Sequence, residues 1–177
     1  MARAKVDKNS REYLEKNLAS GRQSLLIVLI FTVVNLVMVM LDSGTYFLFS
    51  ASVPYYLTMY GKGIDNGFVN GAWDVTGTYT ITGLVVSAVV LGLFLLCWLL
   101  SKKRSGWLTV ALVLFILDTL ALLLFTFTIV NDPAGNIMDF VFHAYVIGCL
   151  IHGIVAGKKL KKLDAQPQDY YGATPEF

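Results

Sequence analysis

Residues 79–130 read YTITGLVVSAVVLGLFLLCWLLSKKRSGWLTVALVLFILDTLALLLFTFTIV, two apolar runs joined by the basic hexapeptide SKKRSG (residues 101–106). Each run, residues 79–100 and residues 107–130, is long enough to cross a bilayer as a helix, which needs about 20 apolar residues. The connection between them is too short for anything but a tight turn. This stretch therefore predicts two antiparallel transmembrane helices that form a hairpin.

Two further apolar runs, residues 24–41 and residues 137–156, flank this hairpin in the sequence. The whole chain of 177 residues is 56% hydrophobic and 15% charged, whereas a soluble domain averages about 25% charged residues. We therefore predict an all-α integral membrane protein, a four-transmembrane-helix bundle whose membrane domain covers residues 24–156.

The basic residues predict the orientation of the bundle. Thirteen of the fourteen Lys and Arg residues lie before Ser24, within residues 101–106 or after Ala156. Such residues collect on the cytoplasmic side of a membrane. We therefore expect a multi-pass protein of the plasma or inner membrane with both termini in the cytoplasm and its basic segments on anionic lipid headgroups.

The predicted cytoplasmic segments differ in character. Residues 1–23 are expected to form an amphipathic segment, with a short helix over residues 8–20 that ends at Gly21. Residues 157–177 begin with the basic sequence GKKLKK and become polar, which predicts a disordered tail.

The long outer loop contains a fifth apolar segment, residues 46–60 (YFLFSASVPYYLTMY). It is too short for a span, and its Pro54 and four Tyr residues suit the membrane surface better than the hydrocarbon core. We predict an interfacial or re-entrant amphipathic helix that covers one end of the bundle. Residues 61–78 are then a turn-rich exposed loop.

Three polar residues within the spans form a predicted intramembrane site. Asp118 and Asn35 each lie eleven residues into their spans, so they share one depth, and His152 is added from the fourth span. A charged residue at this depth costs about 2.5–3.5 kcal/mol on insertion scales and so requires a reason. One interpretation is a proton- or cation-linked transport site or a polar substrate pocket. The other is a neutral Asp118 that clamps helices together by hydrogen bonds.

Small residues mark the predicted packing faces. Gly83 and Ser87 lie on one face of the second span, and Ala144 and Gly148 lie four residues apart in the fourth, followed by His152. Such residues let transmembrane helices approach closely. We expect both stripes to face the interior, with the stripe of the fourth span against Asp118.

A second polar face of the fourth span carries Asp139 and His143, which point nearly opposite to Gly148. We expect this outer face to be covered by the loop of residues 42–78 or by a second subunit. With Asp42 it forms an outer-face cluster. The alternatives for this cluster are an interfacial salt bridge or cap and a divalent metal site, since carboxylate and imidazole groups bind zinc.

No catalytic signature is present: the sequence has no HExxH, GxSxG, CxxC, Walker A or GxGxxG motif. No cofactor and no nucleic-acid partner is predicted. The leading hypothesis is a non-enzymatic structural or regulatory subunit of a larger membrane complex, or a small homo-oligomer. The alternative is a small transporter or channel-like protein that uses Asp118 and Asn35. The third is a membrane-embedded enzyme acting on lipid-type substrates at the cluster of Asp42, Asp139 and His143.

Overall fold

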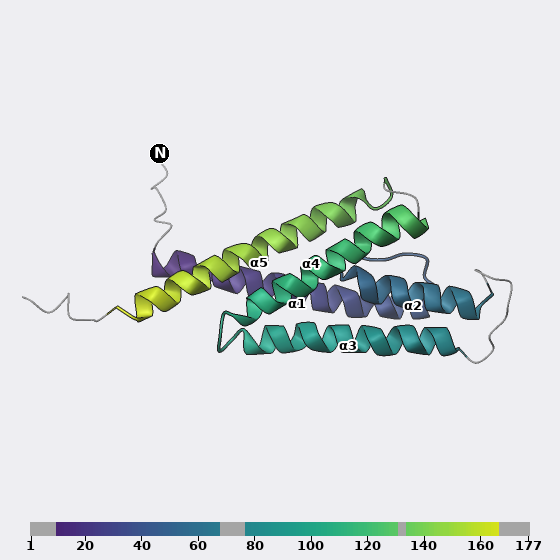
Figure 1. The fold of residues 1–177 in the computed structure, drawn as a ribbon, viewed down its shortest axis with the longest axis horizontal. Helices are drawn as coiled ribbons and strands as arrows, with labels where there is room; N and C mark the ends of the chain where they lie inside the picture. The colour runs from purple at the N-terminus through teal and green to yellow at the C-terminus, as the bar shows by residue number, and fades with distance from the viewer. Residues whose placement is uncertain (1–9, 68–76, 131–133, 167–177) are drawn as a thin grey trace, which may run out of the picture.

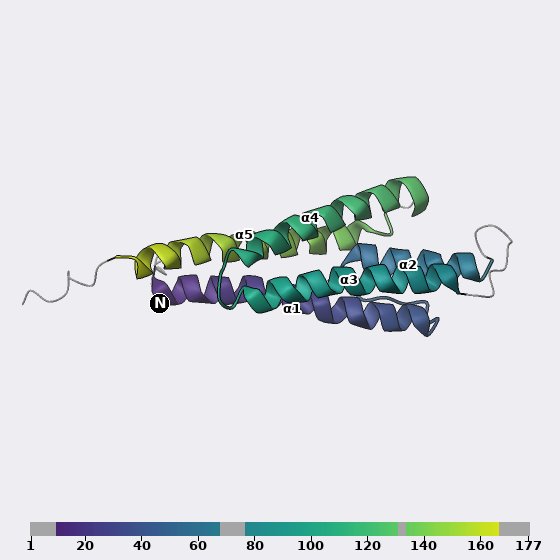
Figure 2. The same cartoon turned by 60° about the horizontal axis from the view of Figure 1, so that its bottom comes forward.

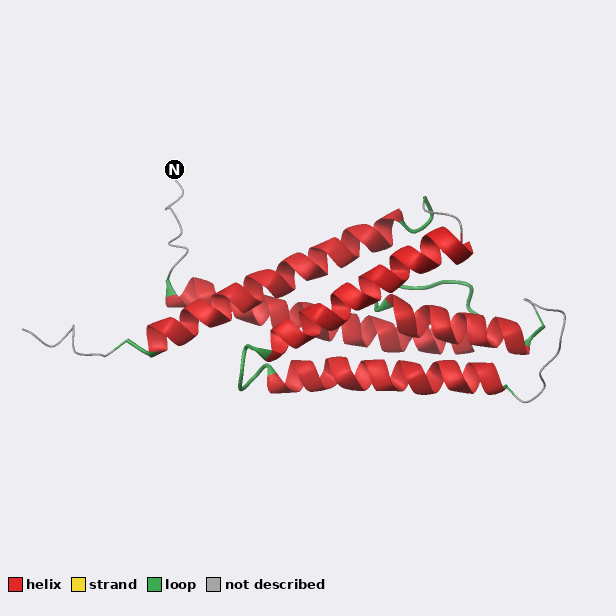
Figure 3. Cartoon of the chain, viewed as in Figure 1, coloured by secondary structure: helices red, strands yellow, loops and turns green. Residues whose placement is uncertain are grey.

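The structure, a computed structural model, describes residues 10–67, 77–130 and 134–166. All regular elements within these ranges are helices, arranged in an elongated bundle (Figures 1 and 3). In chain order they are α1 (Arg11–Met40), α2 (Ser52–Asp65), α3 (Thr78–Leu100), α4 (Trp107–Phe125) with a π-helical turn (Thr126–Val130), and α5 (Ile137–Asp164).

Four of these helices, α1, α3, α4 with its π-helical turn, and α5, are long and apolar enough to cross a membrane. The helical class and the four candidate spans expected from the sequence are therefore confirmed. Residues 101–106 form the tight connection between α3 and α4. The outward faces of the long helices carry large apolar side chains, such as Val85, Leu117 and Val141, which are more than half exposed.

The predicted helix end at Gly21 is wrong, and both α1 and α5 extend beyond the apolar runs. Ser10 caps α1, accepting a hydrogen bond from the Tyr13 amide at 3.4 Å, and the helix then continues through Gly21. A Cβ atom on Gly21 would lie 3.2 Å from the Cα atom of Gly153 in α5. This glycine therefore permits a close helix contact instead of ending the helix.

At the other terminus α5 extends to Asp164, so the first part of the predicted tail is helical. The ends of the two predicted terminal segments, residues 1–9 and 167–177, lie outside the described residues, as do residues 68–76 of the predicted outer loop.

The short helix α2 lies inside the bundle. After α1 ends, residues 41–51 turn back along it, and α2 begins beside the middle of α4 (Figures 1 and 2). It then runs antiparallel to α3 toward the end of the bundle where α3 begins. Fourteen residues give a length of about 21 Å at the usual helical rise. The segment predicted over residues 46–60 is thus an extended stretch followed by a half-length helix.

The bundle has two different halves. In the half that contains the α3–α4 turn, α1, α3, α4 and α5 share an apolar core that includes Leu25, Phe94, Phe115 and Leu150. In the other half α2 packs between the long helices (Figure 2). The first turn of α2 marks the boundary, and the buried polar residues gather there.

Candidate functional site

The first turn of α2 is held by a carboxylate from another helix. Asp118 of α4 accepts hydrogen bonds from the backbone amides of Ser52 at Oδ2 and Val53 at Oδ1, both at 2.8 Å. The first amides of an α-helix lack partners within the helix, and a negative charge there interacts favourably with the helix dipole. Asp118, which is only 4% exposed, therefore caps α2.

His143 of α5 completes this site. Its Nε2 atom lies 3.2 Å from Asp118 Oδ2 and 3.3 Å from Ser52 Oγ, and its Nδ1 atom lies 2.8 Å from the backbone oxygen of Asp139. The ring stacks on Phe115 with 4.8 Å between centroids. Because a carbonyl oxygen only accepts, Nδ1 carries a hydrogen and donates it.

This set of residues differs from the serine–histidine–aspartate relay of hydrolases. In the relay the carboxylate binds Nδ1 while the serine meets Nε2. Here Asp118 and Ser52 both meet Nε2 of His143, and Nδ1 is bound to a backbone carbonyl. The geometry fits a helix cap, with His143 bracing the side chains of Asp118 and Ser52.

The segment before α2 is fixed to α1 by neutral side chains. Asn35 accepts a hydrogen bond from the Phe47 amide at 2.6 Å and donates to the Phe47 carbonyl at 2.7 Å and to Ser50 Oγ at 2.8 Å. Thr32 Oγ1 accepts from the Ala51 amide at 2.8 Å. Asn35 and Asp118 thus act on consecutive parts of one segment.

The structure does not bring His152 to Asp118. His152 is exposed on the outer side of α5, and its Nδ1 donates to the carbonyl of Gly148. Ala144 is exposed as well, and a Cβ atom on Gly148 would meet no atom within 4 Å. Because opposite faces of one helix cannot both point inward, the face of His143 replaces the predicted stripe.

The other predicted packing residues lie in the interface between α2 and α3. A Cβ atom on Gly83 would lie 2.7 Å from the carbonyl oxygen of Leu57. Ser87 Oγ donates to the carbonyl of Pro54 at 3.0 Å and lies 3.2 Å from Thr58 Oγ1. This close contact fixes α2 along its length.

The outer-face cluster does not converge. Asp42 pairs with Lys62 at 2.7 Å, whereas Asp139 accepts a hydrogen bond from the Tyr46 hydroxyl at 2.8 Å and His143 turns to Asp118. Within the described ranges no three His, Cys, Asp or Glu side chains come together as metal ligands.

Lys62 is the single basic residue that departs from the charge pattern, and it has a structural role. Its ammonium donates to the carbonyls of Val39 and Met40, each at 3.0 Å, and pairs with Asp42. An ammonium has three hydrogens, and all three are matched by these acceptors. Lys62 therefore caps the C-terminus of α1, where a positive charge is favoured.

Asp65 repeats the role of Asp118 at the next helix. Its oxygens accept from the amides of Tyr79 at 3.2 Å and Thr80 at 2.7 Å, and from the Thr80 hydroxyl. Desolvation raises the pKa of Asp65, but the hydrogen bonds from Thr80 and Tyr79 outweigh it and leave this pKa below its usual value. Carboxylates from elsewhere in the chain therefore cap both α2 and α3.

Tyrosines surround Asp139 at the end of the bundle. Burial, followed by the hydrogen bond to Asp139, raises the pKa of Tyr46 above its ordinary value. Burial and then the charge of Asp139 raise the pKa of Tyr56 to about 12. The Tyr56 ring also stacks on Phe125 with 5.2 Å between centroids.

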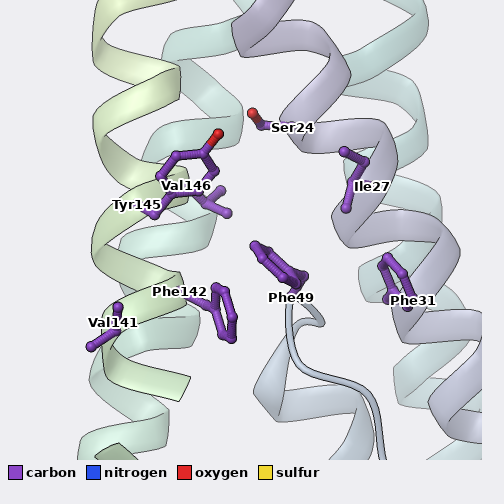
Figure 4. Close-up of a pocket in the computed structure, with 8 residues that line it drawn as sticks. All are labelled: Ser24, Ile27, Phe31, Phe49, Val141, Phe142, Tyr145 and Val146. Atoms are coloured by element: carbon purple, nitrogen blue, oxygen red, sulfur yellow. The ribbon is translucent and has the colours of Figure 1, made fainter. Parts of the chain in front are cut away.

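An apolar groove of about 470 Å³ lies between α1 and α5. Figure 4 shows the ring of Phe49 between the two helices, with Phe31 on one side and Phe142 on the other. Phe49 has a φ of 70°, a left-handed conformation that is uncommon for a bulky residue.

No protein-family model, no curated protein and no solved structure matches this chain. The residues themselves therefore carry the functional argument. Of the site residues, sequence reasoning missed Ser52 and Tyr46 and gave Lys62 no role. The sequence Ser52-Val53-Pro54 is itself a signal for the start of a helix, because proline is favoured in the first turn.

Proposed function

We propose that the protein is a multi-pass cell-membrane protein with four spans and both termini in the cytoplasm. We propose that it acts as a non-enzymatic structural or regulatory subunit, either in a larger membrane complex or as a homo-oligomer. The start of α1, the α3–α4 turn and the end of α5 lie at the same end of the bundle (Figure 1). That end carries the basic residues, which supports its placement at anionic headgroups on the cytoplasmic side.

One observation carries the non-enzymatic role. In the described part of the chain, each buried side-chain nitrogen or oxygen has a hydrogen-bond partner. Both oxygens of Asp118 are used on the first turn of α2, and Asn35 is used on Phe47 and Ser50. A ligand or substrate site needs polar groups that are directed at the ligand. These polar groups instead hold α2 in place.

The outer surface fits association within the membrane. The lipid bilayer is the partner of the exposed apolar faces, and the small residues Ala144 and Gly148 lie on the exposed side of α5. Small residues on an exposed transmembrane face allow another helix to approach closely. This surface is available to a second copy or to a larger partner.

Extraction of the tagged chain in native lipid discs, followed by native mass spectrometry, tests the role as a subunit. The expected result is a complex of fixed stoichiometry, with a mass above that of the 19.5 kDa chain. Gly148→Leu should reduce this complex. Gly92→Leu in α3, where an added Cβ atom would likewise meet no atom within 4 Å, is the matched substitution and should leave the complex intact. A chain that is monomeric in native lipid would refute the proposal.

Cysteine labelling tests the topology separately. In a background in which Cys97 and Cys149 are replaced by Ala, Lys103→Cys should react with a membrane-impermeant maleimide only after the cytoplasmic side is opened. Reaction of Lys103→Cys in intact cells would contradict the proposed orientation.

A second candidate is a small proton-linked transporter or channel-like protein. One observation favours it: Asp118 and His143 are in buried contact at the start of the half-length helix α2. Ionisable groups in this position are typical of transport pathways. Proteoliposomes with a pH-sensitive dye should then show proton flux that Asp118→Asn abolishes, and the absence of flux in the unmodified protein excludes this role.

A further inference from the structure

We propose that the groove between α1 and α5 binds one phospholipid of the cytoplasmic leaflet, with an acyl chain lying along Phe49. The inference rests on the proposed placement of the protein in a membrane. It holds for a subunit and for a transporter alike, because neither Asp118 nor Asn35 lines the groove.

The groove is bounded by α1, α5 and the segment that connects α1 to α2. At the basic end of the bundle the two helices touch, because Gly21 of α1 and Gly153 of α5 lack side chains there. Farther along, the ring of Phe49 lies between the helices, with 3.6 Å between its centroid and that of Phe142 (Figure 4). The helices therefore diverge and leave a concave space, which is open on the side where Tyr145 is 59% exposed.

The lining of the groove fits a hydrocarbon chain. None of the described residues that line it is charged. The Ser24 hydroxyl donates its hydrogen to the Ser20 carbonyl at 3.1 Å, so it offers no donor to a ligand. Apolar cavities stay free of water and bind apolar molecules, and a hydrocarbon chain needs no hydrogen-bond partner. The lining therefore favours an acyl chain over a polar solute.

The few polar atoms of the lining indicate the direction of the lipid. Figure 4 shows the hydroxyls of Ser24 and Tyr145 toward one end of the groove and the rings of Phe31, Phe49 and Phe142 toward the other. Ser24 is nearer the start of α1, which lies at the basic end of the bundle. In the proposed orientation this end faces the cytoplasmic headgroups. The hydroxyl end of the groove thus faces the glycerol region of that leaflet, and the ring end faces the acyl chain.

The size of the groove fits a single chain. From Ser24 to Phe31 α1 rises by about 10 Å, which is about two thirds of the ~15 Å hydrocarbon depth of one leaflet. A cavity of about 150 Å³ holds one benzene molecule, which has six carbon atoms. The groove of about 470 Å³ is about three times as large, so by the same measure it has room for roughly 18 carbon atoms. This is one acyl chain of a common phospholipid.

Phe49 forms one wall of the groove in an uncommon backbone conformation. Its φ of 70° lies in the left-handed region, which glycine adopts freely and a bulky residue rarely adopts. Such conformations persist where the surrounding contacts hold them, and they concentrate at ligand sites. The ring is held by Phe142 and by Phe31, whose centroid lies 6.4 Å away. Phe49 is therefore a fixed surface against which an acyl chain packs by dispersion.

Native mass spectrometry of the full chain tests the proposal, after release from nanodiscs of palmitoyl-oleoyl phosphatidylcholine and phosphatidylglycerol in equal parts. We expect one phospholipid per chain to remain at a collision energy that removes the loosely held lipids. Ile27 lines the groove, so Ile27→Trp should fill it and lower the fraction of lipid-bound chains several-fold. Val85→Trp on the exposed face of α3 is the matched control and should leave this fraction unchanged. Flotation with vesicles of the same composition establishes whether each chain inserts.

Photochemical cross-linking of the unmodified protein gives a second measurement that needs no variant. The probe is a phosphatidylcholine with a diazirine at the end of one acyl chain. It should attach to Phe31, Phe49 and Phe142 several-fold more often than to Val85 and Leu117, which are exposed on other helices. If Ile27→Trp does not insert, this measurement decides alone.

The outcomes separate this inference from the proposed function. It is overturned if the unmodified chain floats with vesicles but retains no lipid, if Ile27→Trp retains as much lipid as Val85→Trp, or if cross-linking is even over the surface. It is also overturned if Ile27→Trp removes a second copy of the chain instead of a lipid. A chain that does not float overturns the membrane placement and this inference together. A monomer that keeps its lipid supports the inference and contradicts only the role as a subunit.

Discussion

Replacement of Gly83 by alanine is the sharpest test of the position of α2. A Cβ atom at this position would lie 2.7 Å from the carbonyl oxygen of Leu57 and 3.0 Å from the Cα atom of Thr58. Both neighbours are backbone atoms, so no side-chain rotation relieves the clash. An ordinary contact begins at 3.4 Å, so α2 must move away from α3 by about 0.7 Å.

The magnitude depends on how firmly α2 is held elsewhere. Asp118 binds its first turn with two hydrogen bonds of 2.8 Å, and at its other end Asp65 holds the first turn of α3. Because both ends are fixed, we expect the upper part of the usual overpacking cost, about 3 kcal/mol. Alanine returns about 1 kcal/mol through its better helix propensity. The net loss should be about 2 kcal/mol in the free energy of unfolding.

Gly92→Ala on the same helix is the matched control. A Cβ atom there would meet no atom within 4 Å, so only the gain in helix propensity of about 1 kcal/mol is expected. Equilibrium unfolding in mixed detergent–lipid micelles, followed by tryptophan fluorescence, should separate the two variants by about 3 kcal/mol, more than a hundredfold in the unfolding constant. Equal stabilities for Gly83→Ala and Gly92→Ala would show that α2 does not pack against α3.

Three further changes address the groups that fix the ends of the segment. Asn35→Leu leaves the Phe47 amide and carbonyl without partners, and the same unfolding assay should show a loss of about 2–4 kcal/mol. Lys62→Met removes the cap of α1, but because its partner Asp42 has a side chain that is 77% exposed, a loss of only about 1 kcal/mol is expected in thermal unfolding. Burial raises the pKa of Tyr56 to about 12, so the folded protein keeps a proton that the unfolded chain releases near pH ~10. The free energy of unfolding should therefore fall as the pH rises from ~10 to ~12. Tyr56→Phe should remove this part of the loss when unfolding is measured at each pH and tyrosine ionisation is followed by ultraviolet absorbance.

The four candidate spans could be predicted because they depend on length and composition alone. An apolar run of about 20 residues has few alternatives to a long helix, and a short basic connection permits only a hairpin. Asp118 and Asn35 could be singled out for a related reason, since a polar group in an apolar helix is costly and needs a partner. These inferences require no knowledge of which helices are neighbours.

The partners of those residues could not be predicted, because most of them are backbone atoms. Asp118 binds the amides of Ser52 and Val53, and Asn35 binds the amide and carbonyl of Phe47. Every residue except proline carries such an amide, so no side-chain pattern marks the one that will be bound. Proline at position 54 indicates where α2 begins but not where that start lies in the bundle.

The orientation of α5 follows from the cost of an unpaired polar side chain and not from the positions of its small residues. Small residues occur on both of its faces: Gly148 points outward, whereas Gly153 packs against Gly21 of α1. Lipid accepts a glycine or an alanine at little cost, whereas an unpaired His143 in the hydrocarbon core would be expensive. His152 lies nearer the basic end of the helix, where, in the proposed orientation, its ring nitrogen would be within reach of the headgroups. The polar residue farther from a membrane surface therefore decides which face turns inward, and small residues decide only how closely that face can pack.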